Sequence, residues 1–276
     1  MKKFVVLLCV MMILLVGCNT NSIKTEESID DFAVVNIDVS KVIFDEAPPE
    51  NFDYPDDSYV FIRNEIYPAK SMKYQYDIRR EYAVFLPKFS DLKGAEADVI
   101  RAYFKDKYEK EIAEYAPLLI DGEECFPNSA TQSLYFVRNT YQYNIAGNFL
   151  SITYNNSMYS GGAHGMYGSF VEIFDLTTGE LLGYNDFFGD HATANKELEP
   201  IIAGHFGEEH RVTGLRNVMQ YEEYIPTFRI EESGIVFMFN PYEIASFADG
   251  MIEVLIPYNE LKEILLVEIR GENDYL

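Results

Sequence analysis

Short runs of apolar residues recur along this 276-residue chain, and they are separated by turn-forming residues. This pattern is typical of β-strands. Segment 59–89, rich in Tyr, Val, Ile and Phe, predicts two or three strands. Three hairpins are expected where a glycine-containing turn separates two such runs, in segments 134–154, 171–182 and 228–239. A last strand is expected at 251–256.

Helical spacing appears in fewer places. Between 95 and 115, apolar side chains recur every three or four residues, which predicts a helix with one buried face that ends before Pro117. Core packing explains this stripe without a ligand. Further helices are expected at 192–206 and from Pro257 to about 267. Regular alternation of strands and helices is absent, so the pattern predicts an α+β fold of antiparallel sheets with a few packed helices in two small subdomains.

The N-terminal segment is typical of a secretory signal peptide. Two lysines precede an unbroken apolar run at 4–16, which is too short to span a bilayer comfortably. The run ends in Leu15-Val16-Gly17-Cys18, which resembles the lipobox of bacterial lipoproteins. That resemblance implies cleavage before Cys18 and attachment of diacylglycerol to its sulfur. The alternative is an ordinary secretory signal with a chance cysteine.

These features predict four parts: a signal peptide at 1–17, a polar tether at 18–45, an N-terminal α+β domain at 46–165 and a C-terminal α+β domain at 166–276. Cys9 leaves with the signal and Cys18 carries lipid, so Cys125 is the one remaining cysteine. An intrachain disulfide is therefore excluded from the expected mature protein, and the fold depends on its core.

The charge is strongly unbalanced, with 22 Lys and Arg against 45 Asp and Glu, a net charge of −23. A chain this acidic repels nucleic acids and anionic lipid headgroups, so nucleic-acid binding is excluded. Acidity favours a cationic partner, although solubility alone also explains it.

Familiar catalytic motifs are missing from the sequence. His205 and His210 are five residues apart, whereas two zinc-binding histidines on one helix face are four apart. The sequence has no Gly-x-Ser-x-Gly, and Cys125 follows acidic residues that disfavour a thiolate. Paired carboxylates for glycoside hydrolysis stay open as a possibility, without specific support. We therefore expect a binding protein, not an enzyme, with no cofactor and no metal ion.

One glycine-rich segment stands out as a candidate binding or structural loop, namely Tyr159, Gly161, Gly162 and His164, followed by Gly165. Glycines at this density between strands indicate positive φ or close backbone contact. His164 has two possible roles, either recognising a ligand or locking the turn through a bond to a neighbouring carbonyl.

Several segments together resemble a known family. The motifs are Tyr-Ser-Gly-Gly-Ala-His at 159–164, Phe-Asp-Leu-Thr-Thr-Gly-Glu-Leu-Leu at 174–182, Asp-Phe-Phe at 186–188, Phe-Met-Phe-Asn-Pro-Tyr-Glu-Ile-Ala at 237–245, and Val-Leu-Ile-Pro-Tyr at 254–258. In this order, over about 55–268, they are similar to the paired extracytoplasmic domains of RsiV-type anti-sigma factors and PdaC-type peptidoglycan deacetylases.

This resemblance implies an α+β fold without catalytic residues and, from the anti-sigma members, lysozyme binding. We find no sigma-binding, membrane-spanning or deacetylase segment, so only the binding half carries over. The expected function is a lipid-anchored module of the bacterial cell envelope that binds a cationic protein such as lysozyme, or cell-wall glycan. The alternatives are a peptidoglycan hydrolase or deacetylase, and a structural lipoprotein of envelope assembly.

Overall fold

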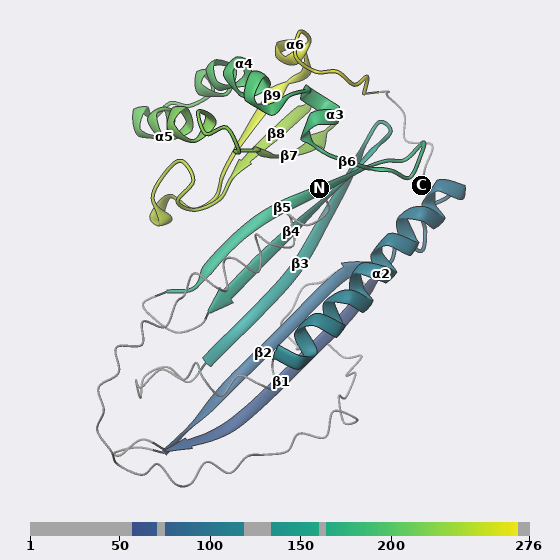
Figure 1. The fold of residues 1–276 in the computed structure, drawn as a ribbon, viewed down its shortest axis with the longest axis vertical. Coiled ribbons are helices and arrows are strands. Elements are labelled where there is room, and N and C mark those ends of the chain that lie inside the picture. Colours follow the sequence, from purple (N-terminus) through teal and green to yellow (C-terminus); the bar gives the residue numbers. More distant parts are fainter. Residues whose placement is uncertain (1–56, 71–74, 119–133, 160–163, 270–276) are drawn as a thin grey trace.

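The computed structural model describes residues 57–70, 75–118, 134–159 and 164–269. It has an α+β fold, as predicted, with a six-stranded and a three-stranded sheet (Figure 1). The first sheet contains β1 (Ser58–Lys70), β2 (Gln75–Pro87), β3 (Leu134–Ala146), β4 (Phe149–Tyr159), β5 (Met166–Asp175) and β6 (Leu181–Leu182). The second contains β7 (Thr227–Glu231), β8 (Gly234–Phe239) and β9 (Ile252–Pro257).

The six-stranded sheet is mostly antiparallel, as expected, but it contains one parallel pair. Its strands follow chain order, and β2 and β3 are parallel while the other neighbours are antiparallel. A parallel pair needs a crossover connection, and α2 (Ala95–Leu118) lies between these two strands in the chain. Because β5 pairs with β4 along its length, this sheet continues past residue 165, where a domain boundary was expected.

Helix α2 covers one face of the long sheet (Figure 1). In its predicted apolar stripe, Ile100 and Phe104 are fully inaccessible. The helix continues to Leu118 instead of ending before Pro117. A proline in the last turn removes only one backbone hydrogen bond. Lys107 anchors the helix by an ion pair of 2.7 Å with Glu172 of β5, where both side chains are mostly buried.

The three-stranded sheet packs against short helices, and these elements form a second core. The helices are α3 (Tyr184–Phe188), α4 (His191–Gly204), α5 (Glu209–Met219) and α6 (Tyr258–Leu261). Helix α4 was predicted, whereas α5 was not. The helix expected to run to residue 267 is wrong in length, because α6 ends at Leu261 and turns follow it.

The two sheets are joined where β7 meets the first sheet. The backbone N–H of Ile230 in β7 donates to the buried Ser151 hydroxyl of β4 at 2.9 Å. Asn144 of β3 donates its side-chain amide to the Ile230 carbonyl. The loop between β8 and β9 lies beside the turn end of the β4–β5 hairpin, where Phe247 contacts His164 and Tyr167. In the described residues, no helix has the length and apolar character needed to cross a membrane.

Candidate functional site

The structure places the predicted glycine-rich loop between β4 and β5. Tyr159 is the last residue of β4, while Gly161 and Gly162 lie outside the described residues, as does Cys18. At Gly165, a Cβ atom would lie 2.8 Å from the Met158 carbonyl oxygen. At Gly165 itself, the backbone approach is too close for a side chain.

His164 is exposed and its ring meets a second segment of the chain. The ring stacks on Phe247, with centroids 4.1 Å apart and an interplanar angle of 24°. Its Nδ1 lies 2.8 Å from the carbonyl oxygen of Gly165, which can only accept a hydrogen bond. The contact with Gly165 is the kind expected if His164 locks the turn, while its ring is exposed and stacked on Phe247.

Phe247 is the centre of an aromatic cluster. It lies in η3 (Phe247–Asp249), a 3-10 turn in the loop between β8 and β9. Tyr167 of β5 meets it edge-on at 5.4 Å, and Tyr242 lies 5.6 Å away at a tilt of 32°. We call His164, Tyr167, Tyr242 and Phe247 the aromatic surface. Rings from β5, the turn before it and the β8–β9 loop thus converge in one place.

The aromatic surface is largely open to solvent. Tyr167 is 41% exposed and Tyr242 is 57% exposed. Tyr242 also has a backbone φ of +73°, which is costly for a bulky residue without the conformational freedom of glycine. Folding brings these rings together without burying them, although burial would be favourable. Such an arrangement is typical of a recognition surface.

Contacts of Glu243 and Ile244 support the loop that carries Tyr242 and Phe247. The Glu243 carboxylate accepts a hydrogen bond of 3.0 Å from the Asn240 backbone N–H. Burial raises the pKa of Glu243, although these hydrogen bonds oppose the shift. Ile244 lies against α5 at Gly214, where a Cβ atom would come within 1.9 Å of the Ile244 carbonyl oxygen.

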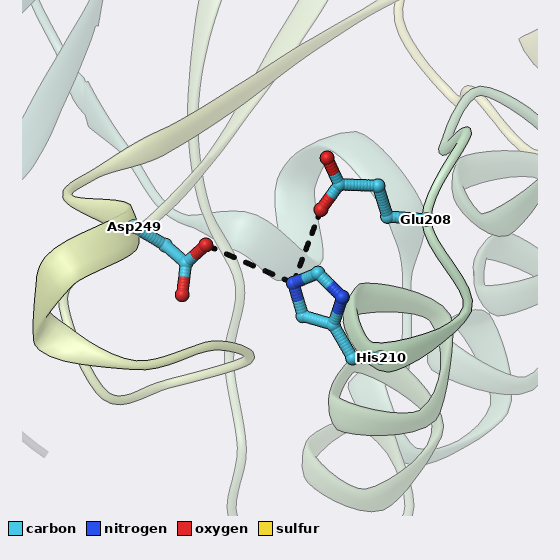
Figure 2. Close-up of side chains that lie close together, drawn as sticks. All are labelled: Glu208, His210 and Asp249. Carbon is cyan, nitrogen blue, oxygen red and sulfur yellow. Dashed lines mark ion pairs between the residues drawn. The ribbon is translucent and has the colours of Figure 1, made fainter.

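A group of charged residues borders the aromatic surface. His210, in the first turn of α5, lies between two carboxylates (Figure 2), 3.1 Å from Glu208 and 3.7 Å from Asp249. Asp249 accepts hydrogen bonds from the Ser246 hydroxyl and backbone, and the bond from the hydroxyl is the main reason why its pKa lies below the ordinary value.

His205 and His210 do not share a helix. His205 caps the C-terminus of α4 and bonds to Glu260 at 3.1 Å, so the two histidines point to different partners. Sequence spacing offered no signal for Asp249 or Phe247, because both meet their partners only through the tertiary fold.

Residues 185–259 match the model of a family described as "Protein of unknown function (DUF3298)". The matched segment is similar to that family, and it includes Tyr242, Phe247 and the charged group. No curated protein sequence matches the chain.

Similar solved structures include a DUF3298 family member from Bacteroides fragilis, with 19% identity and a TM-score of 0.48, which covers 76% of this chain and 94% of that chain. Another is a DUF3298 family protein from Pseudomonas aeruginosa, with 16% identity and a TM-score of 0.48, which covers 78% of this chain and 95% of that chain.

Proposed function

We propose that this protein is a lipid-anchored, non-enzymatic binding module on the outer side of a bacterial membrane, and that the aromatic surface contacts a cationic protein of the lysozyme type. The observation that carries the proposal is the convergence of exposed rings on Phe247. Tyrosine and phenylalanine supply large contact area at low cost in side-chain entropy, and aromatic residues are enriched at protein interfaces.

Charge supports a cationic partner. The whole chain carries −23, and the Glu208 and Asp249 carboxylates lie on the border of the aromatic surface. Opposite charges steer the partners together and raise the association rate, while the rings supply contact energy that is less sensitive to salt. The lipid anchor follows from the lipobox resemblance at Cys18.

A hydrolase is less well supported. Asp175, Asp186 and Glu268 line a hollow beside the β3–β4 turn, where paired carboxylates of a glycosidase would be sought. Asp175 already accepts hydrogen bonds of 2.7 Å from the Thr177 hydroxyl and N–H, and Asp186 accepts one of 2.7 Å from the Gly183 N–H. These two carboxylates thus have a turn-stabilising role that explains their position.

Surface plasmon resonance tests the proposal directly. Protein purified with Cys18→Ala is immobilised, and a basic lysozyme or muropeptides are passed over it at 0.1 M and 1 M salt. We expect lysozyme binding whose association rate falls roughly tenfold or more over that range, because the Debye length shrinks from about 10 Å to about 3 Å.

Other outcomes would contradict the proposal in different ways. Binding of muropeptides but not lysozyme would indicate a glycan receptor. Release of sugars or acetate from peptidoglycan by the same protein would indicate an enzyme. Lysozyme binding with rates indifferent to salt would remove the electrostatic argument and leave acidity as a solubility feature.

A further inference from the structure

We propose that Glu208, His210 and Asp249 form a zinc-binding site. Figure 2 shows the three side chains pointing toward one another, two from the start of α5 and one from η3. Each offers one ligand atom, and these atoms all lie within 4.8 Å of one another. An imidazole nitrogen with two carboxylate oxygens is a donor set suited to zinc, whereas magnesium and calcium prefer oxygen alone.

The distances between the donor atoms suit a common ion. Zinc binds histidine nitrogen and carboxylate oxygen at about 2.0–2.2 Å, so two ligands in a tetrahedral arrangement lie about 3.4 Å apart. The His210 Nε2 atom lies 3.1 Å from Glu208 Oε2 and 3.7 Å from Asp249 Oδ1, on either side of that value. Small side-chain adjustments suffice to place all three donors around one ion.

Glu208 and His210 have few competing hydrogen bonds. Glu208 is the N-cap residue of α5, yet its side chain makes no capping hydrogen bond. Within the described part of the chain, the His210 ring makes its two close contacts with carboxylates and no hydrogen bond, in contrast with His205, which is hydrogen-bonded to Glu260.

Asp249 is oriented by an outer contact of the kind found around metal ligands. Its Oδ2 atom accepts hydrogen bonds from the Ser246 N–H at 3.0 Å and from the Ser246 hydroxyl at 2.6 Å, while Oδ1 faces His210. Such contacts fix the direction of a ligand and support its charge.

Arg211 is the competitor for these carboxylates. Its guanidinium lies 3.4 Å from Glu208 and 3.9 Å from Asp249, but these distances are long for a charge-assisted hydrogen bond. Its Nε atom is buried without a hydrogen-bond partner. The arginine therefore balances the two charges only in part, and its side chain is poorly satisfied where it is.

A bound ion would connect α5 to the loop between β8 and β9. Asp249 lies two residues after Phe247, so the ion would fix the turn that carries the centre of the aromatic surface. Exposure of all three ligands leaves the remaining coordination position open to water or to a group from a partner.

Isothermal titration calorimetry of the full-length protein in detergent, stripped of metal with a chelator, tests the site with ZnCl₂. We expect one ion per chain and no comparable binding of MgCl₂. Because loss of an outer contact alone weakens metal binding roughly 10–100-fold, Ser246→Ala should lie in that range, and His210→Ala or Asp249→Asn should lose at least about tenfold. Asp249→Asn keeps an oxygen that accepts from Ser246.

Two further variants make the result specific. His205→Ala is the matched control, because it removes an exposed histidine–glutamate contact outside the site, and it should titrate like the wild type. Arg211→Gln should bind zinc at least as tightly as the wild type, since it removes the competing cation. The proposal is overturned if the wild type does not bind zinc at millimolar concentration, or if His210→Ala, folded by circular dichroism, binds it equally well.

Discussion

Asn240 hydrogen-bonds to the backbone of Ser169 in the way that a neighbouring strand would. Its Oδ1 accepts from the Ser169 N–H at 2.6 Å, and its Nδ2 donates to the Ser169 carbonyl at 3.1 Å. Gly168 leaves space for this approach, since a Cβ atom there would lie 3.0 Å from Asn240 Oδ1. One side chain thus ties the loop of Tyr242 and Phe247 to the strand of Tyr167.

Asn240→Ala should therefore destabilise the protein. It leaves the partly buried N–H and C=O groups of Ser169 without these partners, at a cost of about 1–3 kcal/mol. Asn240→Asp should cost at least as much, because it places a second carboxylate beside Glu243. Urea unfolding measures both; a midpoint for Asn240→Ala equal to that of the wild type would show that water replaces the amide without loss.

A methyl group at Gly214 should separate α5 from the loop that it supports. The added Cβ would lie 1.9 Å from the Ile244 carbonyl oxygen, so the helix or the loop must move. We expect Gly214→Ala to cost at least about 2 kcal/mol, as other overpacked sites do.

Gly204→Ala is the matched control for that helix substitution, because nothing lies within 4 Å of a Cβ atom at the end of α4. It should be neutral or raise stability by about 0.4–1 kcal/mol, since alanine restricts the unfolded chain. Thermal melts of the two variants side by side measure the contrast, and equal melting temperatures would argue against close packing at Gly214.

Stability should depend on pH through Glu243. Its pKa is raised in the folded protein, mainly by burial, so the folded state holds this proton more tightly than the unfolded state. The free energy of unfolding therefore falls as pH rises from the ordinary glutamate pKa of 4.5 toward the raised pKa of Glu243. Above that raised pKa, the full cost of burying the ionised carboxylate lowers the stability.

Glu243→Gln removes this titration while keeping an acceptor oxygen for Asn240. The stability of the variant relative to the wild type should increase between pH 4.5 and pH 7. Urea unfolding at several pH values measures the difference, and parallel curves for the two proteins over that range would refute the assignment.

The strand pattern could be predicted from the sequence because it depends on residues that are close together in the chain. Hairpins such as the one around Gly147 have their apolar runs and turn residues side by side in the chain. The parallel pairing of β2 with β3 could not be predicted in this way, since it joins segments separated by a whole helix.

Helix α5 escaped prediction because Gly214 lies in its middle and Thr213 and Asn217 are poor helix formers. Tertiary contacts stabilise it instead, through the buried Leu215 and the close approach of Gly214 to Ile244. Helix propensity is therefore a weak predictor of helices that tertiary packing stabilises.

Only the His164 part of the candidate site could be predicted from the sequence. Glycines around His164 marked that segment as unusual, and the structure places the histidine ring on Phe247. Phe247 itself lies among ordinary polar and apolar neighbours, so only the fold shows that three other rings surround it. The positive φ of Tyr242 likewise has no signal in residue type.

The lipid anchor gives a prediction that concerns residues outside those described. If Cys18 carries diacylglycerol, the wild-type protein should sediment with membranes, and Cys18→Ala should appear in the soluble fraction. Cys125→Ala is the control and should remain with the membranes. Equal membrane partitioning of wild type and Cys18→Ala would exclude lipidation as the means of attachment.

The central claim is that the aromatic surface is the binding surface, and side-chain truncation with binding measured by surface plasmon resonance against a basic lysozyme tests it most directly. Tyr242→Ala and Phe247→Ala should each weaken binding by about 30-fold, as expected for interface hot spots of about 2 kcal/mol. Tyr221→Ala, which removes another tyrosine that is 68% exposed, should bind like the wild type. If Tyr242→Ala and Phe247→Ala also bind lysozyme as the wild type does, the partner contacts another part of the molecule, and the aromatic surface is not the binding surface.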